Sequence, residues 1–179
     1  MRIIGGVHKR KRINPPANIS VRPTTDIAKE SLFNVFNNYF DFEDLSVLDL
    51  FAGTGSISYE FASRGAKEVY AIEIDDKCVQ FIRNQAKTLP FPNLNVVRDD
   101  AHHFLTICTQ KFDIIFADPP FDHKKINDIH KLVFEKDLLN DDGWLVMEHG
   151  PDVNLDQLDG FFDKRKYGKV NFSIFSKHN

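Results

Sequence analysis

The sequence predicts an α/β fold, in which a mostly parallel, twisted sheet carries helices on both faces and ends in an antiparallel hairpin. Two observations support this prediction. From Leu45 onward, apolar strand-like segments alternate with turns and helical segments, which is the pattern of a parallel sheet with crossover helices. Residues 160–176 instead alternate as two short strands around a Tyr167-Gly168-Lys169 turn, which would add antiparallel strands to that sheet.

Before the alternating region, residues 1–25 are basic and interrupted by prolines, so they predict short strands and loop. Thr25 or Asp26 can cap a helix that runs to about Tyr39. The predicted apolar stripe of this helix consists of Ala28, Leu32, Val35, Phe36 and Tyr39.

The alternating region contains five apolar strand candidates and four helical ones. Arg64-Gly65 stops the first of these helices, and Pro90 and Pro92 end the second. The predicted strands are Ser46–Phe51, Glu68–Glu73, Leu94–Arg98, Phe112–Ala117 and Gly143–Glu148. The predicted helices are Ser56–Ser63, Asp76–Thr88, Ala101–Cys108 and Lys125–Leu139, and the hairpin is Gly160–Lys166 with Val170–Ser176.

Length and charge indicate one globular domain with a basic extension. The 179 residues are 42% hydrophobic, which is enough for a core. Residues 1–30 hold seven basic and two acidic side chains, a net charge of +5, whereas the rest of the chain has a net charge of −8. We therefore divide the chain into a basic extension and helix, residues 1–40, and a main domain, residues 41–179. A basic arm on an acidic body suggests contact with phosphates, although a solvated charge run would look the same.

No apolar run approaches the ~20 residues that cross a bilayer, and residues 1–12 lack the apolar core of a signal peptide. A cytoplasmic protein without membrane contact is expected. Cys78 and Cys108 are too few for a disulfide framework or a cysteine metal site, and neither follows a proline. Two packed, reduced thiols are favoured over a catalytic cysteine, and no metal site is expected because no other His or Cys stands at ligand spacing.

The segment LDLFAGTGS, residues 48–56, predicts a ligand site at the end of the first strand. The strand delivers Asp49 to its carboxyl end, and the turn at Gly53 and Gly55 lets backbone N–H groups approach a ligand closely. Glu73 ends the next strand, twenty residues after Gly53, where a carboxylate can accept both hydroxyls of a ribose. Nicotinamide enzymes and methyltransferases share this logic, but Ser58 stands where the nicotinamide fingerprint has its third glycine.

Asp99 and Asp100 directly follow the third strand. At that strand end, Asp100 can accept a hydrogen bond from an adenine amino group. Either residue would also cap the helix that begins at Ala101, and neighbouring residues can fill both roles.

The segment Asp118-Pro119-Pro120-Phe121 follows the fourth strand and carries the chemistry. The prolines fix the backbone, so the Asp118 carboxylate and the Pro119 carbonyl remain as acceptors. An exocyclic amine is a poor nucleophile because its lone pair is delocalised into the base. Two acceptors aimed at its hydrogens expose that lone pair, and Phe121 offers a face on which an extruded base can stack. The motif therefore predicts direct methyl transfer from a sulfonium to an exocyclic amine, without metal or covalent intermediate.

Several segments together resemble the bacterial RsmD family, which methylates N2 of one guanine in 16S rRNA, the family target being guanine 966. They are RIIGG at 2–6, RPTTDIAKESLFN at 22–34, LDLFAGTGSISYEFASRGA at 48–66, AIEID at 71–75 and FDIIFADPPF at 112–121. The resemblance implies a Rossmann-like class I methyltransferase fold, S-adenosylmethionine as cofactor, and the assembled small ribosomal subunit as substrate. Where the family usually has a glycine in its basic arm, this chain has Arg10.

The predicted site residues follow from the motifs and from this resemblance. Those expected to bind the cofactor are Asp49, Phe51, Gly53, Gly55, Glu73, Ile74, Asp100 and Ala101. Those expected to act in catalysis are Asp118, Pro119, Pro120 and Phe121. Those expected to contact RNA are Arg2, Lys9, Arg10, Lys11, Arg12 and Arg22, and the protein is expected to be a monomer.

Three rival functions remain open. An adenine-N6 methyltransferase acting on DNA or RNA would carry the same motif at 118–121, although a DNA enzyme usually has a separate recognition domain for which 179 residues leave no room. A non-catalytic RNA-binding module on this fold would be expected to lose Asp118 or the glycine loop. A nicotinamide-dependent dehydrogenase explains Glu73 but not residues 118–121.

Overall fold

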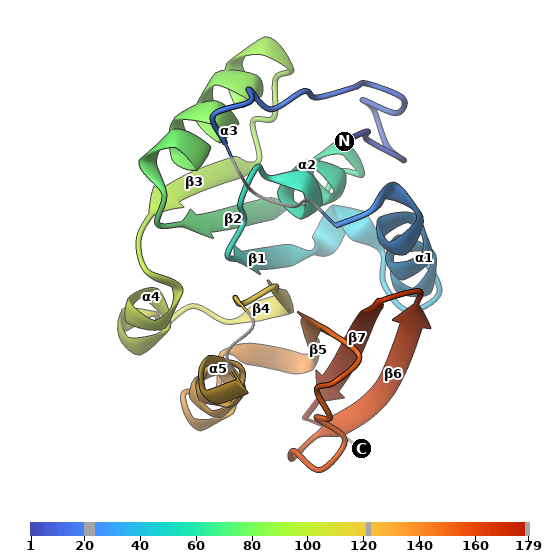
Figure 1. Cartoon of the computed structure of the whole chain (residues 1–179), viewed down its shortest axis with the longest axis vertical. Coiled ribbons are helices and arrows are strands. Elements are labelled where there is room, and N and C mark those ends of the chain that lie inside the picture. The colour runs from blue at the N-terminus through green and yellow to red at the C-terminus, as the bar shows by residue number, and fades with distance from the viewer. Residues whose placement is uncertain (20–23, 121–122, 178–179) are drawn as a thin grey trace.

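A computed structural model describes residues 1–19, 24–120 and 123–177 of the chain (Figure 1). The strands are β1 (Ser46–Leu50), β2 (Glu68–Glu73), β3 (Leu94–Arg98), β4 (Phe112–Ala117), β5 (Leu139–His149), β6 (Phe161–Tyr167) and β7 (Val170–Ser176). The helices are α1 (Asp26–Phe36), α2 (Ser56–Ser63), α3 (Asp76–Thr88), α4 (Ala101–Ile107) and α5 (His123–Glu135), with a short 3₁₀ helix at Phe42–Asp44.

All seven strands form one sheet in the order β3-β2-β1-β4-β5-β7-β6. The first five strands pair in parallel, and β7 joins β5 antiparallel before turning back into β6. The chain order reverses between β1 and β4, so the crevice at the carboxyl ends of these two strands is where an open α/β sheet binds its ligands. The predicted fold class, including the terminal hairpin, is confirmed.

Helices cover both faces of the sheet and enclose two hydrophobic cores. One core packs α1 and α2 against side chains such as Val47, Phe116 and Phe172. The other packs α4 and α5 against the opposite face, through Leu48, Ile115 and Phe175. Figure 1 shows α1, α2 and α3 on one side of the sheet and α4 and α5 on the other. Within the described residues, no helix combines the length and apolar character needed to cross a membrane.

Most predicted boundaries agree with the structure to within two residues, but three differ by three or four residues. The helix predicted over Lys125–Leu139 ends at Glu135 because Asp137 adopts a left-handed conformation, with φ of 55°. β5 then begins at Leu139 instead of Gly143, since Leu139 pairs with Phe112 ahead of a register shift. α1 ends at Phe36, and Tyr39, predicted to lie on its apolar stripe, is 54% exposed beyond the helix end.

Residues 1–13 fold back on themselves as a narrow loop, which we call the arm. A single antiparallel bridge joins Arg2 to Arg12, where the sequence predicted short strands. The Ile3 N–H donates to Lys11 O at 3.0 Å, and the Arg10 N–H donates to Ile3 O at 2.9 Å. Arg10 has a φ of 71°, a conformation that favours glycine, so this chain keeps the glycine-like turn with an arginine.

The arm is fixed to α2 through Glu60, which is fully buried. Its carboxylate accepts hydrogen bonds from the backbone N–H groups of Ile4 and Gly5 and from Arg64 Nε, each at 2.8 Å. Lys29, 1% exposed, lies 3.7 Å from Glu60 and donates to Arg2 O at 2.7 Å. A buried ion pair therefore joins the arm, α1 and α2, and Ile3 and Ile13 of the arm belong to the core beneath them.

Candidate methyl-transfer site

The turn between β1 and α2 forms a glycine loop. Gly53 and Gly55 have φ of 55° and 82°, the left-handed region that glycine adopts without strain. A Cβ on Gly55 would lie 2.9 Å from the Tyr59 ring and 3.1 Å from Ile82, so a side chain is excluded there on steric grounds as well. The backbone of the loop is therefore free of side chains at Gly53 and Gly55, at the N-terminus of α2. Its N–H groups can approach a ligand closely there.

Glu73, the last residue of β2, faces this loop. Its Oε2 accepts from the Gly53 N–H at 2.7 Å, and its Oε1 accepts from the Asp75 N–H at 2.8 Å. Its carboxylate is thus held at the carboxyl edge of the sheet by two backbone donors. Each carboxylate oxygen has more than one lone pair, so ribose hydroxyls can still bind to the same group.

Asp49 in β1 is 1% exposed and accepts a hydrogen bond from the hydroxyl of Ser58. Burial raises the pKa of Asp49 to about 7, and the Ser58 hydrogen bond opposes that rise. Ser58, which stands where the nicotinamide fingerprint would have its third glycine, therefore has a definite role, because it orients a buried carboxylate beneath the glycine loop.

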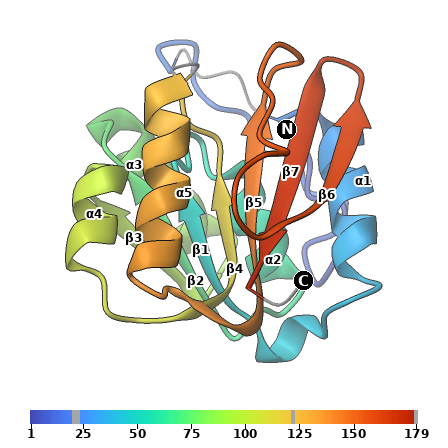
Figure 2. The same cartoon turned by 90° about the horizontal axis from the view of Figure 1, so that it is seen from below.

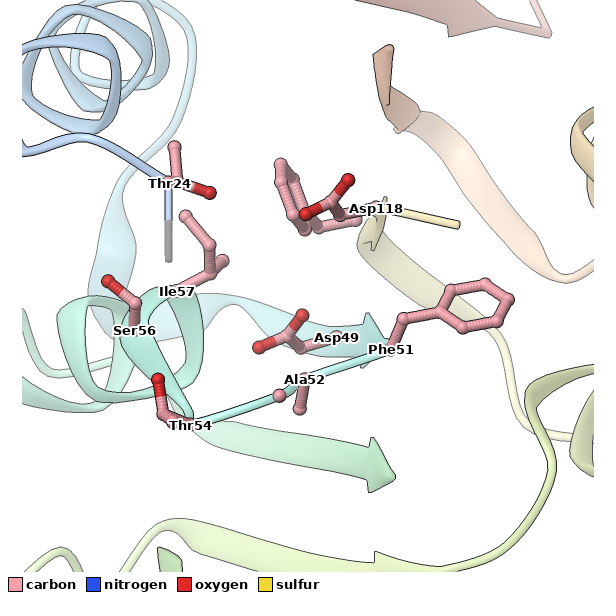
Figure 3. A pocket seen from close by; sticks show the side chains of 10 residues that line it. Thr24, Asp49, Phe51, Ala52, Thr54, Ser56, Ile57 and Asp118 are labelled. Carbon is pink, nitrogen blue, oxygen red and sulfur yellow. The ribbon is translucent and has the colours of Figure 1, made fainter. Parts of the chain in front are cut away.

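Asp49 and Asp118 line the same pocket, together with Thr24, Phe51, the glycine loop and the start of α2. Figure 3 shows the Asp118 carboxylate above that of Asp49, with Thr24 on the side of α1 and the Phe51 ring turned away from both carboxylates. Glu148, near the end of β5, accepts a hydrogen bond from the Thr24 hydroxyl at 2.8 Å. Burial, and after it the nearby charges of Glu148 and Asp49, raise the pKa of Asp118 to about 8.

These three carboxylates favour a cationic ligand, because a positive charge among them would relieve their mutual repulsion. A sulfonium cofactor has such a charge. The glycine loop without side chains and the fixed Glu73 carboxylate suit the adenosine and ribose of the same molecule. The residues present therefore fit S-adenosylmethionine. Among the residues with described positions, no group of three or more His, Cys, Asp or Glu side chains is placed to hold a metal ion.

The remaining predicted cofactor residues lie along the same edge but outside this pocket. Asp100 caps α4 by accepting from the His103 N–H at 3.0 Å, so the helix-cap interpretation is confirmed and an adenine contact stays a prediction. Ala101, the first residue of α4, is buried, and Ile74, directly after Glu73, is 60% exposed. In the catalytic motif, Pro119 is buried and Pro120 exposed, whereas Phe121, like Arg22 of the RNA set, lies outside the described residues.

The five described RNA-binding candidates are all exposed, but they occupy two places. Arg2 and Arg12 line a hollow with Asp26 at the start of α1, close to the glycine loop, since Met1 Sδ lies 3.9 Å from Thr54 Oγ1. Lys9, Arg10 and Lys11 form the turn of the arm. The neighbouring His8 reaches Pro90 O, beyond the end of α3.

Sequence reasoning missed Glu148 and Thr24. Glu148 had a detectable signal, because it is an acidic residue near the end of an apolar strand, as Asp49 and Glu73 are. Thr24 had none, since its partner lies 124 residues away in the chain. The cysteines behave as predicted, because both are free and buried, and burial raises the pKa of Cys78 to about 11, away from a reactive thiolate.

The protein is a class I S-adenosylmethionine-dependent methyltransferase. Its defining features are the parallel sheet whose strand order reverses, the glycine loop, the acidic residue at the end of β2 and the motif that starts at Asp118 after β4. A family model described as "Conserved hypothetical protein 95" matches residues 1–176, and the chain belongs to this family, which is the RsmD family.

Named relatives are similar over most of the chain. Ribosomal RNA small subunit methyltransferase D of Escherichia coli K12 is 34% identical, over 83% of this chain and 71% of its own. The Bacillus subtilis protein YlbH, provisionally named an rRNA methyltransferase, is 35% identical over 99% of both chains. Among solved structures, yhhF of Escherichia coli, provisionally described as a methyltransferase, has a TM-score of 0.85 at 28% identity and covers 98% of this chain and 96% of its own.

Replacing Glu73 tests the cofactor site. Glu73→Ala should weaken S-adenosylmethionine binding at least tenfold, because two hydrogen bonds to a charged acceptor contribute up to ~1.5–3 kcal/mol each. The loss also frees the Gly53 N–H from its acceptor, so the glycine loop should become less ordered. Calorimetric titration with the cofactor measures the change, with Glu68→Ala at the other end of β2 as the control. Unchanged affinity would remove Glu73 from the site.

Proposed function

We propose that this protein transfers a methyl group from S-adenosylmethionine to the exocyclic N2 of a guanine in 16S rRNA of the small ribosomal subunit, with guanine 966 as the family target. The observation that carries the proposal is Asp118, directly after β4, in one pocket with the glycine loop. The names of the relatives support rRNA as the substrate class.

The chain's own residues would position an amine and stabilise charge. When bound, the cofactor supplies an electrophilic methyl group on a sulfonium. The carboxylate of Asp118 and the carbonyl of Pro119 would accept the two hydrogens of the guanine amine, which directs the nitrogen lone pair out of the base plane. As positive charge develops on that nitrogen, the Asp118 carboxylate stabilises it and can take up the released proton. Phe121 would stack against the extruded base.

The arm would hold the RNA outside the pocket. Its cations are exposed, and Arg2 and Arg12 lie beside the glycine loop, so a bound backbone would pass close to the pocket mouth. In this proposal residues 1–40 contact RNA, and residues 41–179 carry the chemistry. Because the arm is anchored through Glu60 in α2, it is positioned relative to Asp118 before RNA arrives.

Labelled cofactor distinguishes the proposal from its rivals. The purified protein is incubated with small ribosomal subunits, free 16S rRNA and duplex DNA, and the labelled base is mapped. Label on a guanine N2 in the small subunit is the expected result. Label on an adenine N6 would instead support the adenine-N6 methyltransferase, and RNA binding without any label would support the non-catalytic RNA-binding module.

Neutralising the arm tests RNA binding separately from chemistry. Replacing Lys9, Arg10, Lys11 and Arg12 together with glutamine should weaken rRNA binding and reduce the slope of log affinity against log salt by roughly one unit per lost phosphate contact. Cofactor affinity should not change. An unaltered RNA affinity with an unaltered salt slope would mean that these side chains are only a solvated surface.

A further inference from the structure

The C-terminal hairpin carries a second cluster of cations, which none of the motifs above includes. Residues 164–169 contain four basic side chains and no acidic one, whereas the chain after residue 30 is acidic overall. We call Lys164, Arg165, Lys166 and Lys169 the basic hairpin. Two of the four are already paired, Lys164 with Asp156 at 3.3 Å and Arg165 with Asp163 at 2.6 Å. Lys166 and Lys169 are exposed, and among the described residues no ion pair involves them.

Strand register places this hairpin at the edge of the sheet that holds the site. Because β7 runs antiparallel to β5, its start lies beside the end of β5, where Asn171 pairs with His149 and Phe172 with Glu148. In turn, Lys166 pairs with Asn171 and Arg165 with Phe172. Arg165 is therefore two strand spacings from Glu148, about 10 Å, and the turn at Gly168 projects beyond it. Figure 2 shows the β6–β7 turn at the end of the molecule where β5 finishes.

The sheet order also decides which ligand would meet the hairpin. The glycine loop and Glu73 assign the ends of β1 and β2 to the cofactor, so the ends of β4 and β5 and the start of β7 remain for the substrate. Arg2 and Arg12 line a hollow with Met1, which contacts Thr54 of the glycine loop, on the β1 side of Asp118, whereas the basic hairpin lies on the β5 side. A Cβ on Gly168 would meet nothing within 4 Å, so the turn faces open space at this position.

We propose that Lys166 and Lys169 of the basic hairpin bind phosphates of the substrate RNA, on the side of the Asp118 pocket opposite the arm. The proposal rests on the proposed function in taking RNA as the substrate. The arm and the basic hairpin would then bind the RNA backbone on the two sides of one nucleotide. Fixing the flanking phosphates in this way allows the base between them to leave its stack, as extrusion of a base requires.

A different role for these lysines is protection of an edge. β6 is the outermost strand, and charged side chains on such strands prevent pairing with another molecule. Lys166, the penultimate residue of β6, is placed for that role, but Lys169 lies in the turn, where no strand edge remains. The sign of the charge separates the two roles, because either sign protects an edge and only a positive one binds phosphate.

The test is binding of purified small ribosomal subunits at several salt concentrations. A Lys166→Gln/Lys169→Gln variant should bind about tenfold more weakly at physiological salt, with the log–log salt slope reduced by roughly 1.4 to 1.8 units for two lost contacts. S-adenosylmethionine affinity should stay at the wild-type value. The matched control, Lys131→Gln/Lys136→Gln, removes the same charge from the last part of α5 and the residue that follows it, and should bind like wild type.

Two further variants separate phosphate binding from folding or aggregation. Lys166→Arg/Lys169→Arg should restore binding, and Lys166→Glu/Lys169→Glu should remain monodisperse but bind more weakly than the glutamine variant. Aggregation of the glutamine variant with normal RNA affinity of the soluble fraction would overturn the proposal in favour of edge protection. If the glutamine variant bound the subunit with wild-type affinity and salt slope while the wild-type enzyme was active, only the hairpin proposal would be overturned. A wild-type protein that neither binds nor methylates the subunit would overturn the proposed function as well.

Discussion

Asp118→Ala should reduce single-turnover methylation of small ribosomal subunits by ~10²–10³, the range for losing one electrostatic partner of a transition state. The carboxylate would interact most strongly once positive charge develops on the amine, so the loss should appear in the rate and hardly in substrate affinity. Asp118→Asn should keep part of the activity, because its carbonyl oxygen still accepts a hydrogen bond. Rapid-quench kinetics with labelled cofactor measure the rate, and calorimetry measures cofactor affinity alongside.

Stability provides the control for this variant. Asp118 is half-buried near Glu148 and Asp49, and these surroundings raise its pKa to about 8, so they disfavour its charged form. Removing the group should leave the melting temperature unchanged or higher, which separates a lost catalytic group from a damaged fold. Asp141→Ala, an exposed carboxylate in the first part of β5, should have no effect on the rate. A wild-type rate in Asp118→Ala would leave residues 118–121 as a structural turn.

The raised pKa also predicts a pH dependence. Stabilising the positive charge on the amine and taking up its proton both need the ionised carboxylate, and a group with a raised pKa is mostly ionised only above that pKa. The methylation rate of the wild-type enzyme at low cofactor concentration, which reports the free enzyme, should therefore rise with pH as the pH approaches about 8 and then level off. Asp118→Asn has no titrating group at this position, so its rate should depend less on pH over the same range.

Glu60→Ala should have the largest effect on stability, a loss of about 3–5 kcal/mol, because it leaves a buried cation without its partner. Lys29 and Glu60 are 1% and 0% exposed, so water cannot replace the lost carboxylate. The N–H groups of Ile4 and Gly5 would lose their acceptor in the same step. Denaturant unfolding measures the change, and proteolysis within residues 1–13 should become faster as the arm leaves α2.

An exposed pair provides the comparison for Glu60. Glu135→Ala removes the carboxylate that lies 3.7 Å from Lys131 on α5, where both side chains are more than 60% exposed. That pair should contribute less than ~1 kcal/mol. If the two variants lost similar stability, the buried network would not be what fixes the arm. RNA affinity of Glu60→Ala, measured at a temperature where it remains folded, then shows how much binding depends on a fixed arm.

The sequence by itself determined those features that depend on neighbours in the chain. The bounds of α2, α3, β2, β3 and β4 agree with prediction because an apolar period and a stop signal are both local. The glycine loop was predictable for the same reason, and Glu73 was found because parallel strands end at a common edge. The start of β5 was not predictable, since Leu139 becomes part of a strand only by pairing with Phe112.

Only the tertiary structure decided which distant side chains meet. Thr24 and Glu148 form a hydrogen bond across 124 residues, and together with Asp49 they surround Asp118, the proposed catalytic group. Lys29 and Glu60 look like surface charges in the sequence, yet each lies on a helix face that the fold closes over. The basic hairpin reads as an ordinary charge run until β7 pairs with β5 and brings its turn to the edge of the site. Strand pairing and burial depend on contacts between distant parts of the chain, so no local pattern records them.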